Sequence, residues 1–260
     1  MKRLVICLLL LLLASCAARR EQAPGEFPAE SDILAAYNGT NAESGPFSIK
    51  MSLRFGSEGR TNRVTALMWG NNDRDLRLDI MAGIGANVAR IQSSPDSFLL
   101  YSPAAHKEYY HDGPSPLLRV GVPVPFDLAA FANLLNGRYA AVFGQAQPAG
   151  ARPDGNLLTI ECAGAPGGRL RLDALGRPVS WQEGAYGSNG WRLDFAYEGS
   201  DAMRPARLDM AHENGGKCLI LVKERSAPDG AYSDDQMRLI VPAGTPRMPL
   251  KQYLRQGQAV

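Results

Sequence analysis

Three histidines are the first residues to consider for metal or acid–base chemistry: His106, His111 and His212. None has the histidine and cysteine partners, at the right spacing, that make a zinc site. His106 and His111 flank Tyr109-Tyr110, and we interpret them as residues at the end of a surface strand. The pair Asp234-Asp235 is interpreted as a solvated turn rather than a cation site. No metal site is therefore expected.

Motifs for nucleophilic or phosphate chemistry are also missing from the sequence. There is no Gly-x-Ser-x-Gly elbow and no phosphate loop. Gly83-Ile84-Gly85 does not extend into a dinucleotide fingerprint, and Glu183 and Glu198 belong to separate predicted strands. We therefore predict no catalytic residue, no cofactor and no enzymatic activity.

Cys16 is the residue whose position does indicate chemistry. A short basic region, Lys2-Arg3, precedes an apolar run over residues 4–13, which is shorter than the ~20 residues that cross a bilayer. The run ends in Leu-Ala-Ser-Cys, with the cysteine at position 16, and this resembles the lipobox of bacterial lipoproteins. The resemblance implies cleavage before Cys16, lipidation of Cys16, and residues 1–15 as a lipoprotein signal peptide. The alternative is an ordinary signal peptide with an incidental cysteine.

Removal of residues 1–15 also removes Lys2 and Arg3, two of 28 basic residues, so 26 basic and 26 acidic residues remain. A near-neutral chain without long charge blocks does not favour nucleic acid as a partner. Residues 16–29 are polar and contain Pro24 and Pro28, which predicts a flexible tether. Ala17 follows Cys16; in lipoproteins an Asp there signals inner-membrane retention, so by that resemblance its absence indicates the outer membrane.

Two further cysteines, Cys162 and Cys218, leave two alternatives open. An oxidising compartment permits a disulfide between them, but spacing does not decide between this bond and two buried free thiols.

The elements that follow the tether read as one mainly β domain over residues 30–260. A helix is predicted over 32–38, capped by Ser31, and another over 127–136, begun by Asp127 and ended by Gly137. Residues 113–125 and 145–154 are predicted loops, and Met248, Leu250 and Tyr253 a docking segment. Alternating apolar and polar residues predict strands at 47–53, 63–70, 76–80, 86–92, 98–101, 108–110, 158–162, 169–173, 179–181, 191–198, 206–210, 218–222 and 237–241. Turn signals between them indicate an antiparallel meander, in a barrel or strongly curved sheet.

One predicted connection is unusually apolar. Met81 and Ile84 lie between two strands, and Gly83 and Gly85 flank Ile84. Connections on a protein surface are normally polar. Ile84 therefore either folds back onto the core or is an exposed apolar probe that meets a membrane.

Several motifs in sequence order resemble the LolB family of outer-membrane lipoprotein receptors, within the LolA/LolB half-barrel superfamily. These are the lipobox, the early helix, Trp69 in a hairpin strand, and a strand ending in an apolar residue and glycine, here Ile84-Gly85. The helix before Gly137 and the later block Gly176-Arg177-Pro178, Trp181, 191–197 and 205–208 continue the likeness. It covers most of residues 30–225; Ile84 replaces the usual leucine, and the tail after Arg225 is longer than in the family.

The resemblance implies an incomplete antiparallel β-barrel, a curved half-barrel sheet covered by short helices around an apolar cavity. The expected function is that of a monomeric outer-membrane receptor on the periplasmic face, anchored through Cys16. It would accept acylated lipoproteins from a periplasmic LolA-like carrier and insert them into the outer membrane. The alternative is a structural or assembly lipoprotein of the cell envelope with a filled barrel and a protein partner. By strand parity, the residues expected to line an acyl cavity are Leu76, Leu78, Ile80, Leu158, Ile160, Leu170, Leu172, Trp191, Leu193 and Phe195.

Overall fold

The computed structural model describes residues 27–41, 45–57, 60–71, 74–83, 85–162, 166–184, 190–199 and 203–257. The predicted signal peptide, Cys16 and residues 16–26 of the predicted tether lie outside these ranges, as does Ile84. No helix in the described ranges is both long and apolar enough to cross a membrane.

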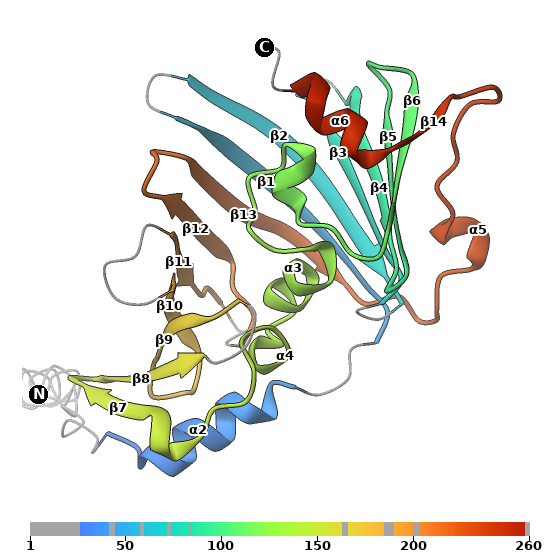
Figure 1. The fold of residues 1–260 in the computed structure, drawn as a ribbon. Helices are drawn as coiled ribbons and strands as arrows, with labels where there is room; N and C mark the ends of the chain where they lie inside the picture. The colour runs from blue at the N-terminus through green and yellow to red at the C-terminus, as the bar shows by residue number, and fades with distance from the viewer. Residues whose placement is uncertain are drawn as a thin grey trace, which may run out of the picture.

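The described chain is dominated by one open, curved sheet of fourteen strands (Figure 1). From one edge to the other, the order is β14-β6-β5-β4-β3-β2-β1-β13-β12-β11-β10-β9-β8-β7. The strands are β1 (Phe47–Ser57), β2 (Arg60–Gly70), β3 (Leu76–Met81), β4 (Asn87–Ser93), β5 (Ser97–Ser102), β6 (Lys107–Asp112), β7 (Ala151–Asp154), β8 (Leu157–Cys162), β9 (Gly168–Leu172), β10 (Pro178–Glu183), β11 (Trp191–Ala196), β12 (Arg207–His212), β13 (Lys217–Ser226) and β14 (Arg247–Pro249).

The chain fills this sheet in two runs that meet at its centre. β1 to β6 lead outward to one edge; the chain then crosses to the opposite edge, and β7 to β13 lead back. β13 pairs with β1, for example Leu53 with Ile220. All neighbours are antiparallel except β14, which runs parallel to β6. The predicted antiparallel meander and half-barrel are confirmed as an open curved sheet, and the alternative of a closed barrel is wrong because β14 and β7 stay apart at its edges.

Helical segments cover the concave face of the sheet (Figure 1). They are α2 (Glu30–Gly39), η1 (Leu117–Val120), α3 (Leu128–Leu135), α4 (Tyr139–Phe143), and, before the edge strand β7, η2 (Pro148–Gly150). The predicted helix over 127–136 is confirmed as α3: the Asp127 carboxylate caps it by accepting the Ala130 N–H at 2.8 Å. Gly137 ends it with φ +75°, and a Cβ there would lie 2.6 Å from the Met203 carbonyl oxygen.

Several predictions about local structure are wrong. α2 starts before Ser31, because the Ala29 carbonyl already accepts the N–H groups of Asp32 and Ile33, and no side chain caps it. β7 lies where a loop was predicted; Pro153 is tolerated there because β7 is an edge strand. Residues 237–241 form no strand, although Met237 and Leu239 are buried and Ile240 is exposed.

Buried and exposed residues alternate over 237–240 because residues 232–240 lie against the outer face of β2 to β4 as an irregular strap. The buried Arg77 guanidinium donates to the carbonyls of Met237, at 3.3 Å, and Arg238. The Asn71 amide exchanges two hydrogen bonds with the Tyr232 backbone. Side chains, rather than strand pairing, therefore fasten the strap. It contains α5 (Asp234–Met237), so Asp234-Asp235 begins a short helix and not the predicted turn.

From the strap, the C-terminal segment passes around the β6 edge of the sheet. β14 covers that edge, and α6 (Leu250–Gly257) follows it directly. Leu250 is buried, and Tyr253 packs against Tyr109 with ring centroids 5.0 Å apart. The predicted docking of Met248, Leu250 and Tyr253 is confirmed.

Apolar side chains from the inner parity of the strands form one core beneath the helices. On the β7–β13 half, Trp181 lies 5.5 Å from the Phe126 ring and 5.6 Å from the Phe143 ring. Cys162 and Cys218 are buried free thiols, so the second of the two alternatives holds. Burial raises the pKa of both thiols to about 12, which keeps them protonated and unreactive.

Candidate functional site

An apolar cavity of about 160 Å³ lies on the concave face of the β1–β6 half. Its walls come from five strands, from the segment around η1, and from α6. The lining residues are Leu53, Phe55, Val64, Ile80, Val88, Ala89, Leu100, Ser102, Val120, Gly121, Val122 and Tyr253. Leu53 and Leu100 are 1% exposed at its floor, whereas Val88 is 46% exposed at its rim. The cavity therefore runs from the buried core to the surface.

Tyr253 closes this cavity from the α6 side. Its ring meets Tyr109 edge-on, and its hydroxyl donates a long hydrogen bond of 3.4 Å to the Val120 carbonyl. Burial raises the pKa of the Tyr253 hydroxyl. Burial, followed by the neighbouring Tyr253, raises the pKa of the Tyr109 hydroxyl, so both phenols stay protonated at physiological pH. Among the described residues of the lining, the polar side chains are the Tyr253 and Ser102 hydroxyls, and none is charged.

The volume of the cavity limits what it holds. A cavity of ~150 Å³ accommodates a six-carbon ring such as benzene, and pockets for larger ligands measure ~300–1,000 Å³. The cavity as it stands holds a fraction of a long acyl chain. A whole chain requires one wall to move. α6 packs mainly on β6, β14 and η1 at the sheet edge, so it is the wall that moves most easily.

Replacement of Tyr253 tests this closure. Tyr253→Ala should lower the free energy of unfolding by roughly 2–3 kcal/mol, less than the ~3–5 kcal/mol of a fully buried aromatic. The same variant should bind an apolar dye more tightly, because the cavity is deeper. Tyr253→Phe, which keeps the ring, is the matched control and should cost less than ~1 kcal/mol. Denaturant unfolding and dye titration measure both effects; unchanged dye binding in Tyr253→Ala would contradict the closure.

The ten predicted lining residues all lie on the covered face, and all are buried. Ile80 is the one among them that lines the cavity. The others pack in the core, as Phe195 does against Tyr139 with ring centroids 5.8 Å apart. Contact with an acyl chain stays a prediction for these residues. Phe55, Val64 and Val122 line the cavity but were not predicted from the sequence. Phe55 could have been found, because it lies two positions after Leu53 in β1 and its side chain therefore points to the same inner face.

The β3–β4 turn, which contains the predicted probe, lies next to this cavity. Met81 ends β3 and is half-buried, and Gly83 and Gly85 are exposed. Gly85 takes φ +84°, a conformation that glycine adopts readily, and its N–H donates to the Ala82 carbonyl at 2.8 Å. Ile84 lies outside the described residues, so its role as a probe stays a prediction. Val88 and Ile80, in the strands beside the turn, both line the cavity.

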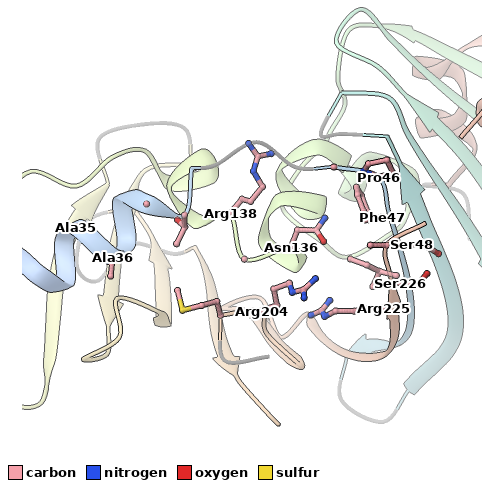
Figure 2. Close-up of a pocket in the computed structure, with 17 residues that line it drawn as sticks. Ala35, Ala36, Pro46, Phe47, Ser48, Asn136, Arg138, Arg204, Arg225 and Ser226 are labelled. Atoms are coloured by element: carbon pink, nitrogen blue, oxygen red, sulfur yellow. The ribbon is translucent and has the colours of Figure 1, made fainter. Parts of the chain in front are cut away.

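A larger cleft of about 660 Å³ lies at the other end of β1, between α2, the end of α3 and the end of β13 (Figure 2). Arg138, Arg204 and Arg225 line it. Arg138 donates to the Asn133 side-chain oxygen at 2.7 Å, and Arg225 donates to the Pro205 carbonyl. These contacts brace the end of α3 and the segment before β12, so we interpret Arg138 and Arg225 as structural. No group of His, Cys, Asp and Glu in the described part of the chain could hold a metal ion.

Comparison with solved structures shows the class of fold. A LolA superfamily protein from Nitrosomonas europaea aligns with a TM-score of 0.51 and 12% identity, over 82% of this chain and 98% of that one. A putative outer-membrane lipoprotein-sorting protein domain from Vibrio parahaemolyticus aligns with 0.51 and 13%, over 81% and 97%. A DUF1329 family protein from Desulfovibrio piger aligns with 0.54 and 11%, over 80% and 95%.

The chain therefore has a LolA/LolB-like fold, as its sequence resemblance implied. Identities this low show the fold and do not single out LolB. No family model and no curated protein matches the sequence.

Proposed function

We propose that this protein is an outer-membrane receptor that is anchored through Cys16 and binds acyl chains without catalysis. It would accept acylated lipoproteins from a periplasmic carrier and release them into the outer membrane. The observation that carries the proposal is the uncharged cavity, which a LolA/LolB-like sheet and α6 enclose and which opens beside the β3–β4 turn. Each buried CH₂ contributes ~0.8 kcal/mol, so an acyl chain gains affinity with every carbon that enters.

Depletion followed by membrane fractionation tests this role. If the protein inserts lipoproteins into the outer membrane, its depletion should move other lipoproteins to the periplasm or the inner membrane, while integral outer-membrane proteins stay in place. An unchanged distribution of lipoproteins would exclude the receptor role in that cell. Re-expression of the wild-type chain is the control.

The alternative, a structural or assembly lipoprotein with a filled core, has one observation in its favour. The β7–β13 half of the concave face is filled by the aromatic layer of Trp181, Phe126 and Phe143. Under this alternative the purified protein carries no lipid and instead copurifies with a protein partner. Lipid extraction of the purified protein therefore separates the two functions.

Ile84→Glu tests the membrane contact of the β3–β4 turn. An exposed Ile84 that enters lipid contributes roughly 1.5–3 kcal/mol, too little to anchor a protein but enough to favour release at that point. The variant should keep its melting temperature and its acyl binding but deliver cargo to vesicles more slowly. Ile84→Leu is the matched control and should deliver normally. A large fall in melting temperature in Ile84→Glu would mean that Ile84 is packed in the core, and the probe would then be abandoned.

A further inference from the structure

The outer face of the sheet carries a cationic patch at the end where the cavity opens. The patch consists of Arg54 in β1, Arg63 in β2 and Lys217 in β13, all exposed. Arg54 lies directly opposite Arg63 across the β1–β2 pair, and Lys217 lies opposite Gly56, one diagonal step from Arg54. Like charges directly opposite each other destabilise a strand pair, so this arrangement opposes folding.

In the described part of the chain, no carboxylate forms an ion pair with these cations. Among the described residues, neither Arg54 nor Lys217 has an ion-pair partner, and Arg63 donates only to the Ser52 hydroxyl, at 3.3 Å. The two carboxylates that line the groove beside these cations are already paired: Asp194 lies 2.8 Å from Arg192 and Asp209 lies 2.6 Å from Arg207. The patch therefore adds net positive charge.

A shallow groove crosses the patch. Its lining includes Arg54, Gly56, Thr61 and Lys217, and farther along it the ion-paired Arg192, Asp194 and Asp209. Because Gly56 has no side chain, the groove is open between the neighbouring strands. Next to Arg54 in sequence, Leu53 and Phe55 point the other way and line the cavity. The end of β1 thus has a cation on its outer face and lines the cavity with its inner face. The β3–β4 turn lies at the same end of the sheet.

We infer that this patch docks the cavity end of the protein on a bilayer that contains anionic lipids. Long-range attraction between cations and lipid phosphates needs no shaped pocket, which suits an open groove. The occupant is the surface of a membrane rather than an acidic protein, because the adjoining rim is apolar: Val88 is 46% exposed there, and Leu118 beside the cavity wall is 39% exposed. The inference does not depend on what the cavity binds.

Headgroup quenching in vesicles tests the docking. The mature protein, acylated on Cys16 and carrying a fluorophore on Thr61→Cys, is reconstituted into vesicles whose lipid headgroups carry a quencher. The buried Cys162 and Cys218 should not react with the label. Quenching should be strong when phosphatidylglycerol is present, weak in pure phosphatidylcholine, and reduced by salt. A label on Pro95→Cys, at an exposed position of the β4–β5 turn at the opposite end of the strands, should be quenched equally in both vesicles.

Matched variants assign the effect to the patch. Arg54→Gln, Arg63→Gln and Lys217→Gln should each lower the ratio of docked to undocked protein about five-fold. The control removes the same charge elsewhere, with Lys50→Gln, Arg152→Gln and Arg247→Gln, and should change the ratio far less. The inference is overturned if the patch variants and the control variants lower the ratio equally, or if quenching in pure phosphatidylcholine is as strong as with phosphatidylglycerol. It is also overturned if inorganic phosphate at constant ionic strength releases the protein, or if quenching requires another protein.

Discussion

Cys16→Ser should abolish acylation of the chain and its processing, while the β domain still folds. The thiol of Cys16 would carry the lipid, and a serine hydroxyl cannot replace it in the lipobox chemistry that the sequence resembles. The buried core of the described residues begins at Ile33 and consists of residues far along the chain from Cys16, so the variant should keep its melting temperature.

Metabolic labelling with palmitate and membrane fractionation measure this loss. Cys7→Ser is the matched control, because Cys7 lies inside the apolar run of the signal and not at its end. This control should be labelled like the wild type. Lipid label and membrane association that persist in Cys16→Ser would show that the lipoprotein interpretation is wrong.

Trp181→Ala should give a large loss of stability. The Trp181 side chain is 1% exposed and packs against both the Phe126 and the Phe143 ring. Removal of a buried aromatic costs ~3–5 kcal/mol, which lowers the melting temperature by roughly 6–20 °C in a domain of this size. The indole N–H has no hydrogen-bond partner among the described residues, so the loss comes from packing alone.

Thermal and denaturant unfolding measure this loss. Leu175→Ala is a suitable control, since Leu175 is 52% exposed and its truncation should stay within about 0.5 kcal/mol of the wild type. A loss below ~1 kcal/mol in Trp181→Ala would mean that the aromatic layer does not fill the β7–β13 half. That half would then be open to ligand.

Local pattern predicted most of the strands and α3 because their signals lie within a few residues. The alternation of Phe47, Ile49, Met51 and Leu53 specifies one buried face, and β1 buries all four. β7 was missed because Pro153 resembles a loop signal, and only its place at the sheet edge makes it acceptable. α4 was missed because only Arg138 separates it from Gly137 and because it is five residues long.

The candidate site was less predictable because distant segments build it. Strand parity identifies Ile80 as an inward residue, but it does not show that η1 and α6 come to lie over the same strands. Tyr253 stands 133 residues from Val120, whose carbonyl it contacts. The strap was predicted as a strand for a related reason. The Arg77 side chain holds residues 237–238 on the sheet, so the alternation of buried and exposed residues in the strap imitates a strand.

Displacement of an apolar dye by acylated peptide tests the central claim, acyl binding by the cavity, most directly. The dye should bind the chain without its signal and anchor (residues 17–260) and brighten as it leaves water. A lipid-modified peptide should displace it, and the same peptide without the acyl group should not. Displacement should strengthen with acyl length, since each CH₂ contributes ~0.8 kcal/mol. Failure of the dye to bind at any concentration, or equal displacement by both peptides, would contradict acyl binding and favour a filled core with a protein partner.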